Sequence, residues 1–234
     1  MSNIATISAP AVSSGKWLFT DLIAKNRLSI IIGVNHTYNA EVANMISRRL
    51  VTGEPMFDKK VCTRGSALYA GKLGKNRALT NSYEIHGKPH SKELLVMSTT
   101  IDLLNQQKII DVVGKLNERG GLIEKGLSLI VFELSTYKSL DPVDAVNVSK
   151  TVSNLNYILE NTGVSILLVQ SEGSARRPGI RVLIGMANVA IKIRSVNYWK
   201  DRSIADLLFT KVNDRLLKSP RYLGRLNFSN VGEQ

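Results

Sequence analysis

Apolar residues along the chain form two kinds of pattern, short continuous runs and longer segments with helical spacing. Leu28 to Ile32 is a short run rich in β-branched residues, which predicts a strand, and Gly33 follows it. Ala40 to Leu50 has apolar side chains every three or four residues, which predicts a helix. Thr52-Gly53-Glu54-Pro55 ends this helix, because glycine caps it and proline cannot continue it. Ser66 to Ala70 is predicted as a second strand.

The middle of the chain repeats this alternation. Apolar residues at helical spacing run from Ser91 to Gly121 and predict one or two helices. Leu127 to Phe132 is apolar throughout and too short for a typical helix, so we expect a strand buried on both faces. Asp141-Pro142 predicts the start of a helix, and Val164 to Val169 predicts the strand after it. Such alternation is typical of parallel strands joined by crossover helices.

The C-terminal part has shorter apolar runs separated by turn residues, which predict late strands, antiparallel at one edge of the sheet. These runs are Arg181 to Ile184, Val189 to Ile193, Leu207 to Lys211 and Leu223 to Phe228. The predicted fold is therefore α/β, with a mainly parallel central sheet flanked by helices and antiparallel C-terminal edge strands. For 234 residues we expect one domain over 17–228, a flexible arm at 1–16 and a tail at 229–234.

Composition narrows the class of protein. With 44% hydrophobic and 21% charged residues the chain is typical of a globular protein. No apolar stretch approaches the roughly 20 residues that a bilayer requires. The first residues have no secretory pattern, so we expect a cytoplasmic protein that does not enter membranes. Cys62 and the three His have no partners at ligand spacing, so we expect no metal site.

The formal charge of +12 is unevenly distributed along the chain. Residues 173–225 hold twelve Lys or Arg against three Asp, whereas residues 93–172 hold ten acidic and six basic residues. Residues 48–92 hold ten Lys or Arg against three acidic residues, so two basic segments flank the acidic middle and can converge on one phosphate-binding face. They can also be scattered over the surface, and the sequence leaves both arrangements open.

The order of these elements resembles the RecA-type P-loop ATPases, in particular the plasmid and phage replication branch related to the hexameric RepA-type helicases. The resemblance covers most of the chain: the strand Ile30-Ile31-Ile32-Gly33 with its loop, the helix ending at Thr52-Gly53-Glu54-Pro55, and later strands ending in Glu133 and Gln170. It implies a RecA-like sheet with ATP and Mg²⁺ as ligands. The nucleotide-binding residues that it implies are Gly33, Asn35, His36, Thr37 and Asn39.

The phosphate loop departs from this family. Residues 33–40, Gly-Val-Asn-His-Thr-Tyr-Asn-Ala, stand where the family has Gly, four variable residues, Gly, Lys and Ser or Thr. The missing glycine would let backbone N–H groups wrap the phosphates, the lysine would neutralise them and the hydroxyl would hold Mg²⁺. A helix N-terminus still follows the loop, so residual nucleotide binding stays open. We expect weak or absent ATPase activity.

By the same resemblance, Glu133 takes the place of the Walker B acid and Gln170 that of a polar sensor of the γ-phosphate. An ordinary polar strand end is an equal explanation for Glu133. The loop after Gln170 contains Arg176 and Arg177, which we expect to contact DNA. Lys211 and Arg215 resemble the pair that ring-forming relatives insert into a neighbouring subunit's site.

The C-terminal aromatic residues are interleaved with cations, an arrangement that stacks bases in single strands or that simply packs the edge of a sheet. These aromatics are Tyr198, Trp199, Tyr222 and Phe228. The residues predicted to bind nucleic acid are Arg176, Arg177, Lys211, Arg215, Arg221 and Arg225.

Three functions follow. The first is a RecA-like accessory protein of a mobile element, acting in DNA replication, maintenance or transfer by binding DNA or a partner ATPase. The second is an active, atypical ATPase, self-associated into a ring or filament, that recruits Lys72, Lys75 or a neighbour's Lys211 in place of the missing lysine. The third is a protein-binding scaffold whose basic surface meets an acidic partner.

Overall fold

The computed structural model describes residues 16–33, 36–70, 94–97, 103, 105–118, 126–134, 145–171, 178–195, 204–212 and 215–228. The helices are α1 (His36–Thr52), α3 (Gln106–Glu118), α4 (Ala145–Thr162) and α6 (Pro178–Met186). The strands are β1 (Trp17–Phe19), β2 (Ile23–Ala24), β3 (Leu28–Gly33), β4 (Ser66–Ala70), β5 (Leu94–Met97), β6 (Leu127–Glu133), β7 (Ser165–Ser171), β8 (Val189–Ser195), β9 (Ile204–Val212) and β10 (Arg215–Asn227).

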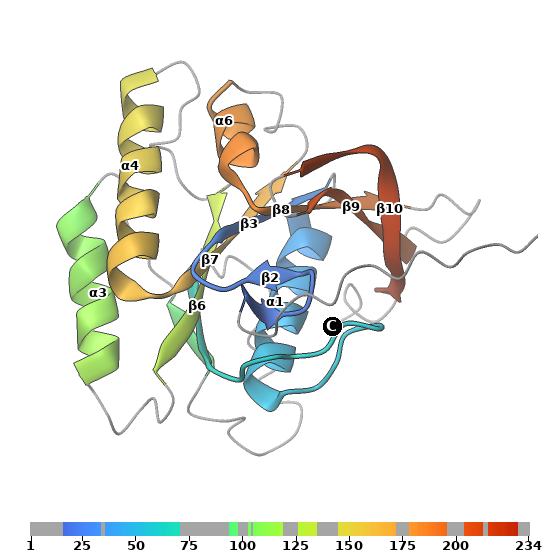
Figure 1. Cartoon of the computed structure of the whole chain (residues 1–234), viewed down its shortest axis with the longest axis horizontal. Coiled ribbons are helices and arrows are strands. Elements are labelled where there is room, and N and C mark those ends of the chain that lie inside the picture. Colours follow the sequence, from blue (N-terminus) through green and yellow to red (C-terminus); the bar gives the residue numbers. More distant parts are fainter. Residues whose placement is uncertain are drawn as a thin grey trace, which may run out of the picture.

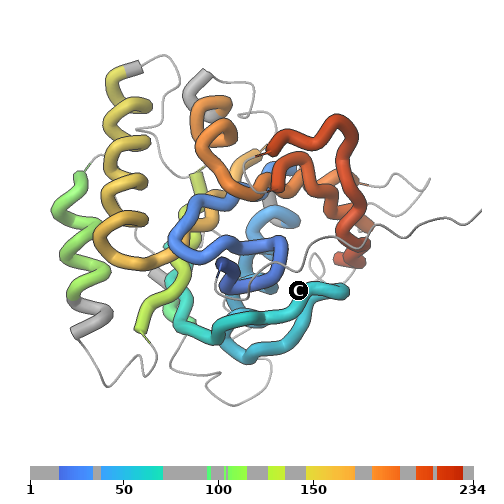
Figure 2. The backbone as a smooth tube through the Cα atoms, in the orientation of Figure 1, coloured from blue at the N-terminus to red at the C-terminus, as the bar shows by residue number. Residues whose placement is uncertain are grey.

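Eight strands form one mixed sheet in the order β10-β9-β8-β3-β7-β6-β4-β5, and β1 and β2 form a separate ribbon (Figure 1). The pairings from β8 to β5 are all parallel, whereas β9 is antiparallel to both of its neighbours. In the backbone trace, the C-terminal strands β9 and β10 (red) lie at one side and the helices α3 and α4 (green and yellow) at the other, with the N-terminal segments (blue) between them (Figure 2). These features confirm an α/β fold with a mainly parallel sheet and antiparallel C-terminal edge strands.

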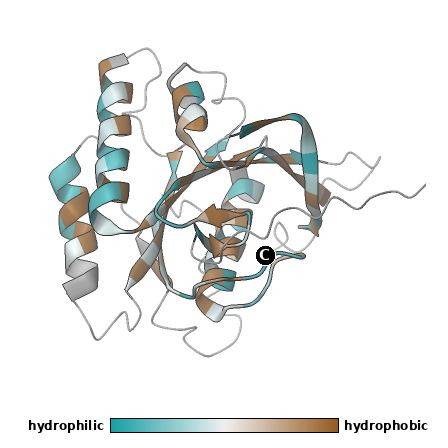
Figure 3. Ribbon diagram, in the orientation of Figure 1, coloured by the Kyte–Doolittle hydropathy of each residue, from teal (hydrophilic) through white to brown (hydrophobic). Residues whose placement is uncertain are grey.

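Helices cover both faces of this sheet because successive side chains of its strands point to opposite sides. In β3, Ile31 packs into the cluster that holds α1, the β1–β2 ribbon and the end of β10. Its neighbour Ile30 packs into the other cluster, with α3, α4 and α6. The central strands are accordingly coloured as mainly hydrophobic in Figure 3, whereas the bend of β10 is hydrophilic. Two apolar layers therefore hold the sheet between them.

Two sequence predictions are wrong. Leu94–Met97 is a parallel edge strand paired with β4, not part of a helix. Arg181 to Ile184 lies in α6, not in a strand. The first run has four apolar residues and the second only three, too few for periodicity to separate strand from helix. Pro178 at the first position of α6 was the stronger signal, because its fixed φ suits a helix start. Val189–Ser195 is a strand, but it pairs parallel to β3 and antiparallel only to β9.

The topology brings the predicted nucleotide-site elements to one edge of the sheet. The strands β3, β7, β6 and β4 are parallel neighbours, so their carboxyl ends lie together. The helix after β3 covers one face, and the helix after β7 covers the other. In open α/β sheets, ligands bind at the carboxyl ends where the connections diverge in this way. None of the helices within the described ranges is long and apolar enough to span a membrane.

Candidate functional site

Only two residues separate the end of β3 at Gly33 from the start of α1 at His36. The helix therefore contains Tyr38, Asn39 and Ala40, which stand at the family's Gly, Lys and Ser or Thr positions. His36 and Thr37 lie in the first turn of α1, and the described part of the chain does not include their side chains or Asn35. The residues that would wrap a phosphate in the family are here the opening turns of a helix.

Asn39 joins the ends of two neighbouring strands. Its side-chain amide donates to the carbonyl of Gly33 at 3.0 Å and to the carbonyl of Gln170 at 2.9 Å. The residue is fully buried, and its Oδ1 finds no hydrogen-bond partner among the described residues. Both N–H donors are thus used on backbone carbonyls at the point where β3 and β7 end. The amide thereby ties together the ends of β3 and β7.

Gly33 is required by this arrangement. A Cβ added there would overlap Asn39 Oδ1 and would come within 2.9 Å of Ile193 Cβ. The match of Gly33 to the family's first glycine therefore has a packing explanation as well as a functional one. A glycine at this position lets α1 approach the end of β3 closely enough for Asn39 to reach both carbonyls.

The two residues beside Asn39 are also packed into the fold. The ring of Tyr38 stacks on that of Phe228 with centroids 4.4 Å apart and planes 9° from parallel. Ala40 is 1% exposed in the core. Tyr38 and Asn39 therefore make contacts that a glycine and a lysine would not make in the same places, and Ala40 is buried without a hydroxyl group.

Glu133 and Gln170 lie at the ends of adjacent strands, but they do not share a face of the sheet. Glu133 is buried at the end of β6, where Tyr69 donates to its Oε2 at 3.3 Å, and both residues lie on the α1 side. Gln170 is buried on β7, and its Nε2 donates to the carbonyl of Ser171 at 3.1 Å. Strand alternation turns its side chain to the α4 and α6 side. The acid and the sensor-like amide thus occupy opposite layers.

The residues predicted to bind nucleic acid are spread over both faces of the C-terminal strands. Lys211 is 4% exposed, and its Nζ donates to the carbonyl of Gly185 at 2.6 Å near the end of α6. Arg221 lies on the other face. Its Cζ is 5.0 Å from the ring centroid of Phe209, and its guanidinium nitrogen is 3.9 Å from Asp21 Oδ2. Arg215 is exposed at the start of β10. Arg176 and Arg177 lie outside the described residues.

Arg225 belongs to a cross-strand cluster that the sequence analysis missed in part. Its Nε donates to Asp206 Oδ1 at 2.7 Å, and Arg194 donates to Oδ2 of the same carboxylate at 3.4 Å. The hydrogen bond from Arg225 is the main cause that lowers the pKa of Asp206, and Arg194 adds to it. The alternation of Lys192 and Arg194 with apolar residues in β8 was the signal for a polar face.

The aromatic residues divide between packing and exposure. Phe228 is 4% exposed in its stack with Tyr38, as the packing explanation predicts. Tyr222 is 58% exposed on β10. Tyr198 and Trp199 lie outside the described ranges.

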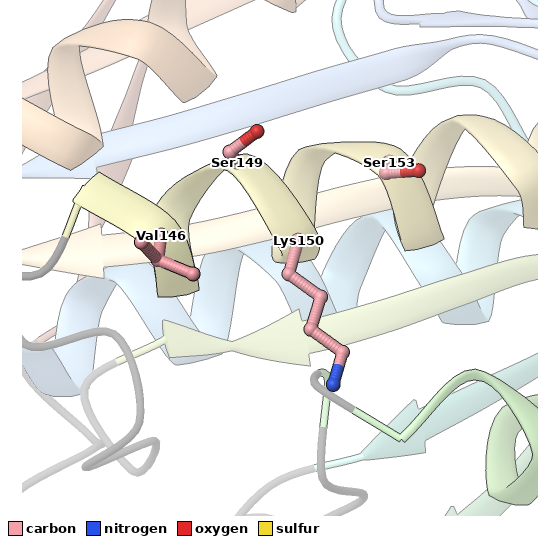
Figure 4. A pocket seen from close by; sticks show the side chains of 4 residues that line it. All are labelled: Val146, Ser149, Lys150 and Ser153. Carbon is pink, nitrogen blue, oxygen red and sulfur yellow. The ribbon is translucent and has the colours of Figure 1, made fainter.

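A shallow hollow follows the outer side of α4 (Figure 4). It measures about 470 Å³ and is lined by Val146, Ser149, Lys150 and Ser153. These side chains come from one helix and include no carboxylate or imidazole, so they hold no acid–base pair. Within the described part of the chain, His, Cys, Asp and Glu form no group of three that could hold a metal ion.

Comparison with known proteins does not assign this chain to a family. No protein-family model matches the chain, and no curated protein matches it significantly. The features of this chain that bear on its function are the geometry of the strand ends, the charges of the C-terminal strands and the residues that resemble the RecA-type family.

Proposed function

We propose that this chain is a RecA-like accessory protein of a plasmid or phage that binds DNA in replication, maintenance or transfer without turning over ATP. The observation that carries the proposal is the position of Asn39. It stands where the family has its phosphate-binding lysine, and its side-chain amide donates hydrogen bonds to the carbonyls of Gly33 and Gln170. A neutral, buried amide in this place does not neutralise phosphate charge, which is most of what the family's loop contributes.

The RecA-like part of the proposal is supported by the arrangement of the strand ends. The strand that leads into α1, the strand that ends in Gln170 and the strand that ends in Glu133 are consecutive neighbours in the sheet. Their carboxyl ends meet at one edge, which is where the resemblance requires a loop, a sensor and an acid. The fold that the sequence resemblance implies and the strand order of this chain are therefore compatible.

The DNA-binding part is supported by charge. The chain carries 31 Lys and Arg against 19 Asp and Glu, and a formal excess of +12 favours polyanions. Several of these cations lie on the C-terminal strands with exposed side chains, Arg194 and Arg225 among them. Because phosphate contacts release counterions, such binding weakens steeply as the salt concentration rises.

The active-ATPase alternative is favoured by one observation, the buried carboxylate of Glu133 at the end of β6. A neighbour's Lys211 is a poor replacement for the missing lysine, because this side chain is buried and bonded to Gly185. Lys72 and Lys75 lie outside the described residues.

A measurement of ATP turnover in the presence of single-stranded DNA and Mg²⁺ distinguishes the proposed DNA-binding protein from the active ATPase. Our proposal predicts no turnover above the background of a Glu133→Gln variant, and no binding of a fluorescent ATP analogue. Turnover that Glu133→Gln abolishes would establish the active enzyme instead. Thermal unfolding of both proteins checks that the variant is folded.

A further inference from the structure

The end of the sheet formed by β8, β9 and β10 carries two rows of side chains that cross the strands, all of them polar except Leu208. In the first row Arg194, Asp206 and Arg225 are register partners, and in the second Lys192, Leu208 and Tyr222 are. Residues that are partners in register lie on the same face of a sheet. We call these six residues the β8–β10 polar face.

This face lies on the side of the sheet that α4 and α6 cover elsewhere. Ile191 and Ile193 alternate with its basic residues in β8 and point into the core around α1, so Lys192 and Arg194 point to the opposite side. In Figure 1, α4 and α6 stack over the centre of the sheet, and β9 and β10 extend beyond them. The two arginine side chains are 61% and 46% exposed.

Asp206 holds the two guanidinium groups in place. Its side chain is 6% exposed, and it accepts hydrogen bonds from Arg194 on one neighbouring strand and from Arg225 on the other. A guanidinium has five N–H donors in a fixed fork, and Arg194 uses one of them on this carboxylate. One buried acid therefore orders two exposed cations, and the face stays net positive.

Tyr222 adds an aromatic surface beside these cations. It is 58% exposed, and its row lies two residues along β9 from the arginine row, or about 7 Å. An exposed ring next to cations stacks unpaired bases while the cations contact the phosphates. A duplex hides the faces of its bases within its own stack, so the ring contributes only to single strands.

We infer that the β8–β10 polar face binds single-stranded DNA, with phosphate contacts from Lys192, Arg194 and Arg225 and base stacking on Tyr222. The inference rests on the proposed function and gives it a site. That site differs from the set predicted from the sequence, because Lys211 is buried beneath α6 and Arg221 lies on the other face.

The stacking contact is tested with Tyr222→Ala and a fluorescein-labelled oligothymidylate in an anisotropy titration. We expect affinity to fall about ten-fold, because a base–aromatic stack is lost. Tyr222→Phe keeps the ring and should bind like the wild type. The matched control is Tyr157→Ala, which removes another exposed tyrosine, on α4, and should leave binding unchanged.

The phosphate contact is tested with Arg194→Gln across a salt series. We expect weaker binding and a slope of log affinity against log salt that is shallower by about 1. Arg27→Gln is the control, because Arg27 is an exposed arginine just before the amino end of β3, whereas Arg194 lies near the carboxyl end of the parallel strand β8.

The outcomes separate this inference from the proposed function. If the wild type binds single-stranded DNA and Tyr222→Ala and Arg194→Gln behave like their controls, the polar face is not the site and the proposed function stands. If the wild type binds no DNA at low salt, both are wrong. Equal melting temperatures of variants and controls show that lost binding is not lost folding.

Discussion

Gly33 and Asn39 depend on each other at the end of β3. Any side chain at residue 33 would overlap the amide of Asn39 and crowd Ile193. We expect Gly33→Ala to lower the free energy of unfolding by about 1–3 kcal/mol, the range for overpacked sites. Gly114→Ala is the control: an added Cβ meets nothing within 4 Å, so in α3 it should stabilise by about 0.5–1 kcal/mol. Urea unfolding of both variants tests the packing; equal tolerance of the two would contradict it.

Asp206 links stability to acid pH. The hydrogen bond from Arg225, aided by Arg194, lowers its pKa below the ordinary value of 3.8. The carboxylate therefore stabilises the folded state above pH 3.8, and this stability is lost as the pH falls through the lowered pKa. Asp206→Asn should destabilise the protein most at neutral pH, with a difference from the wild type that shrinks in acid. Urea unfolding over a pH series measures this, and a constant difference would refute it.

At Glu41 we expect the opposite dependence of stability on pH. Burial raises its pKa above 4.5, against the influence of Arg48. The ionised carboxylate is thus less favourable in the folded protein than in the unfolded chain, and this cost develops as the pH rises above 4.5. Glu41→Gln should gain stability relative to the wild type over that rise, whereas at lower pH the two should converge. Parallel pH series for Glu41→Gln and Asp206→Asn should therefore diverge in opposite directions.

The sequence predicts where β3 ends, but it does not predict which residues contact that end. Comparison of residues 33–40 with the phosphate-loop motif identifies Gly33 as a match and Asn39 as a departure from it, and this comparison needs only the sequence. The carbonyl of Gln170, which Asn39 binds, lies 131 residues away, and that contact depends on the strand order. Likewise, the burial of Lys211 depends on where α6 ends. Contacts of this kind cannot be predicted from local pattern.

Among the elements, α1 is coupled to the residue that directly follows β10 by the stack of Tyr38 on Phe228. A double-mutant cycle with Tyr38→Ala and Phe228→Ala should give a coupling energy of about 0.5–1.5 kcal/mol. The control cycle pairs Phe228→Ala with Tyr157→Ala on α4, and those two effects should add within about 0.5 kcal/mol. Additivity in the first cycle would mean that the ring stack does not hold the start of α1 against the C-terminal strand.

The elements themselves were predictable where their pattern was long or continuous. The buried runs of β3, β6 and β7 and the periodic segment in α1 carry unambiguous signals. The predictions for Leu94–Met97 and for Arg181 to Ile184 are wrong, because their apolar runs are short and fit either structure. In the second case β7 and β8 are both parallel to β3. The chain therefore needs a crossover connection between them, and such a connection is usually a helix. That requirement is topological and not local.

For the whole molecule, those cations of the basic C-terminal segment that the structure describes do not lie on one surface. The antiparallel strands distribute its residues over two faces, with Arg221 on one and Arg194 and Arg225 on the other. The charge of +12 indicates the class of ligand, and the sheet determines which cations act together.

We propose that the protein binds DNA without using nucleotide. Fluorescence anisotropy of labelled single- and double-stranded DNA over a salt series, with and without ATP and Mg²⁺, measures both parts of this claim. We predict binding that falls steeply with salt, favours single strands and is unchanged by ATP. A shift of affinity on adding ATP and Mg²⁺, or no binding at low salt, would contradict the claim.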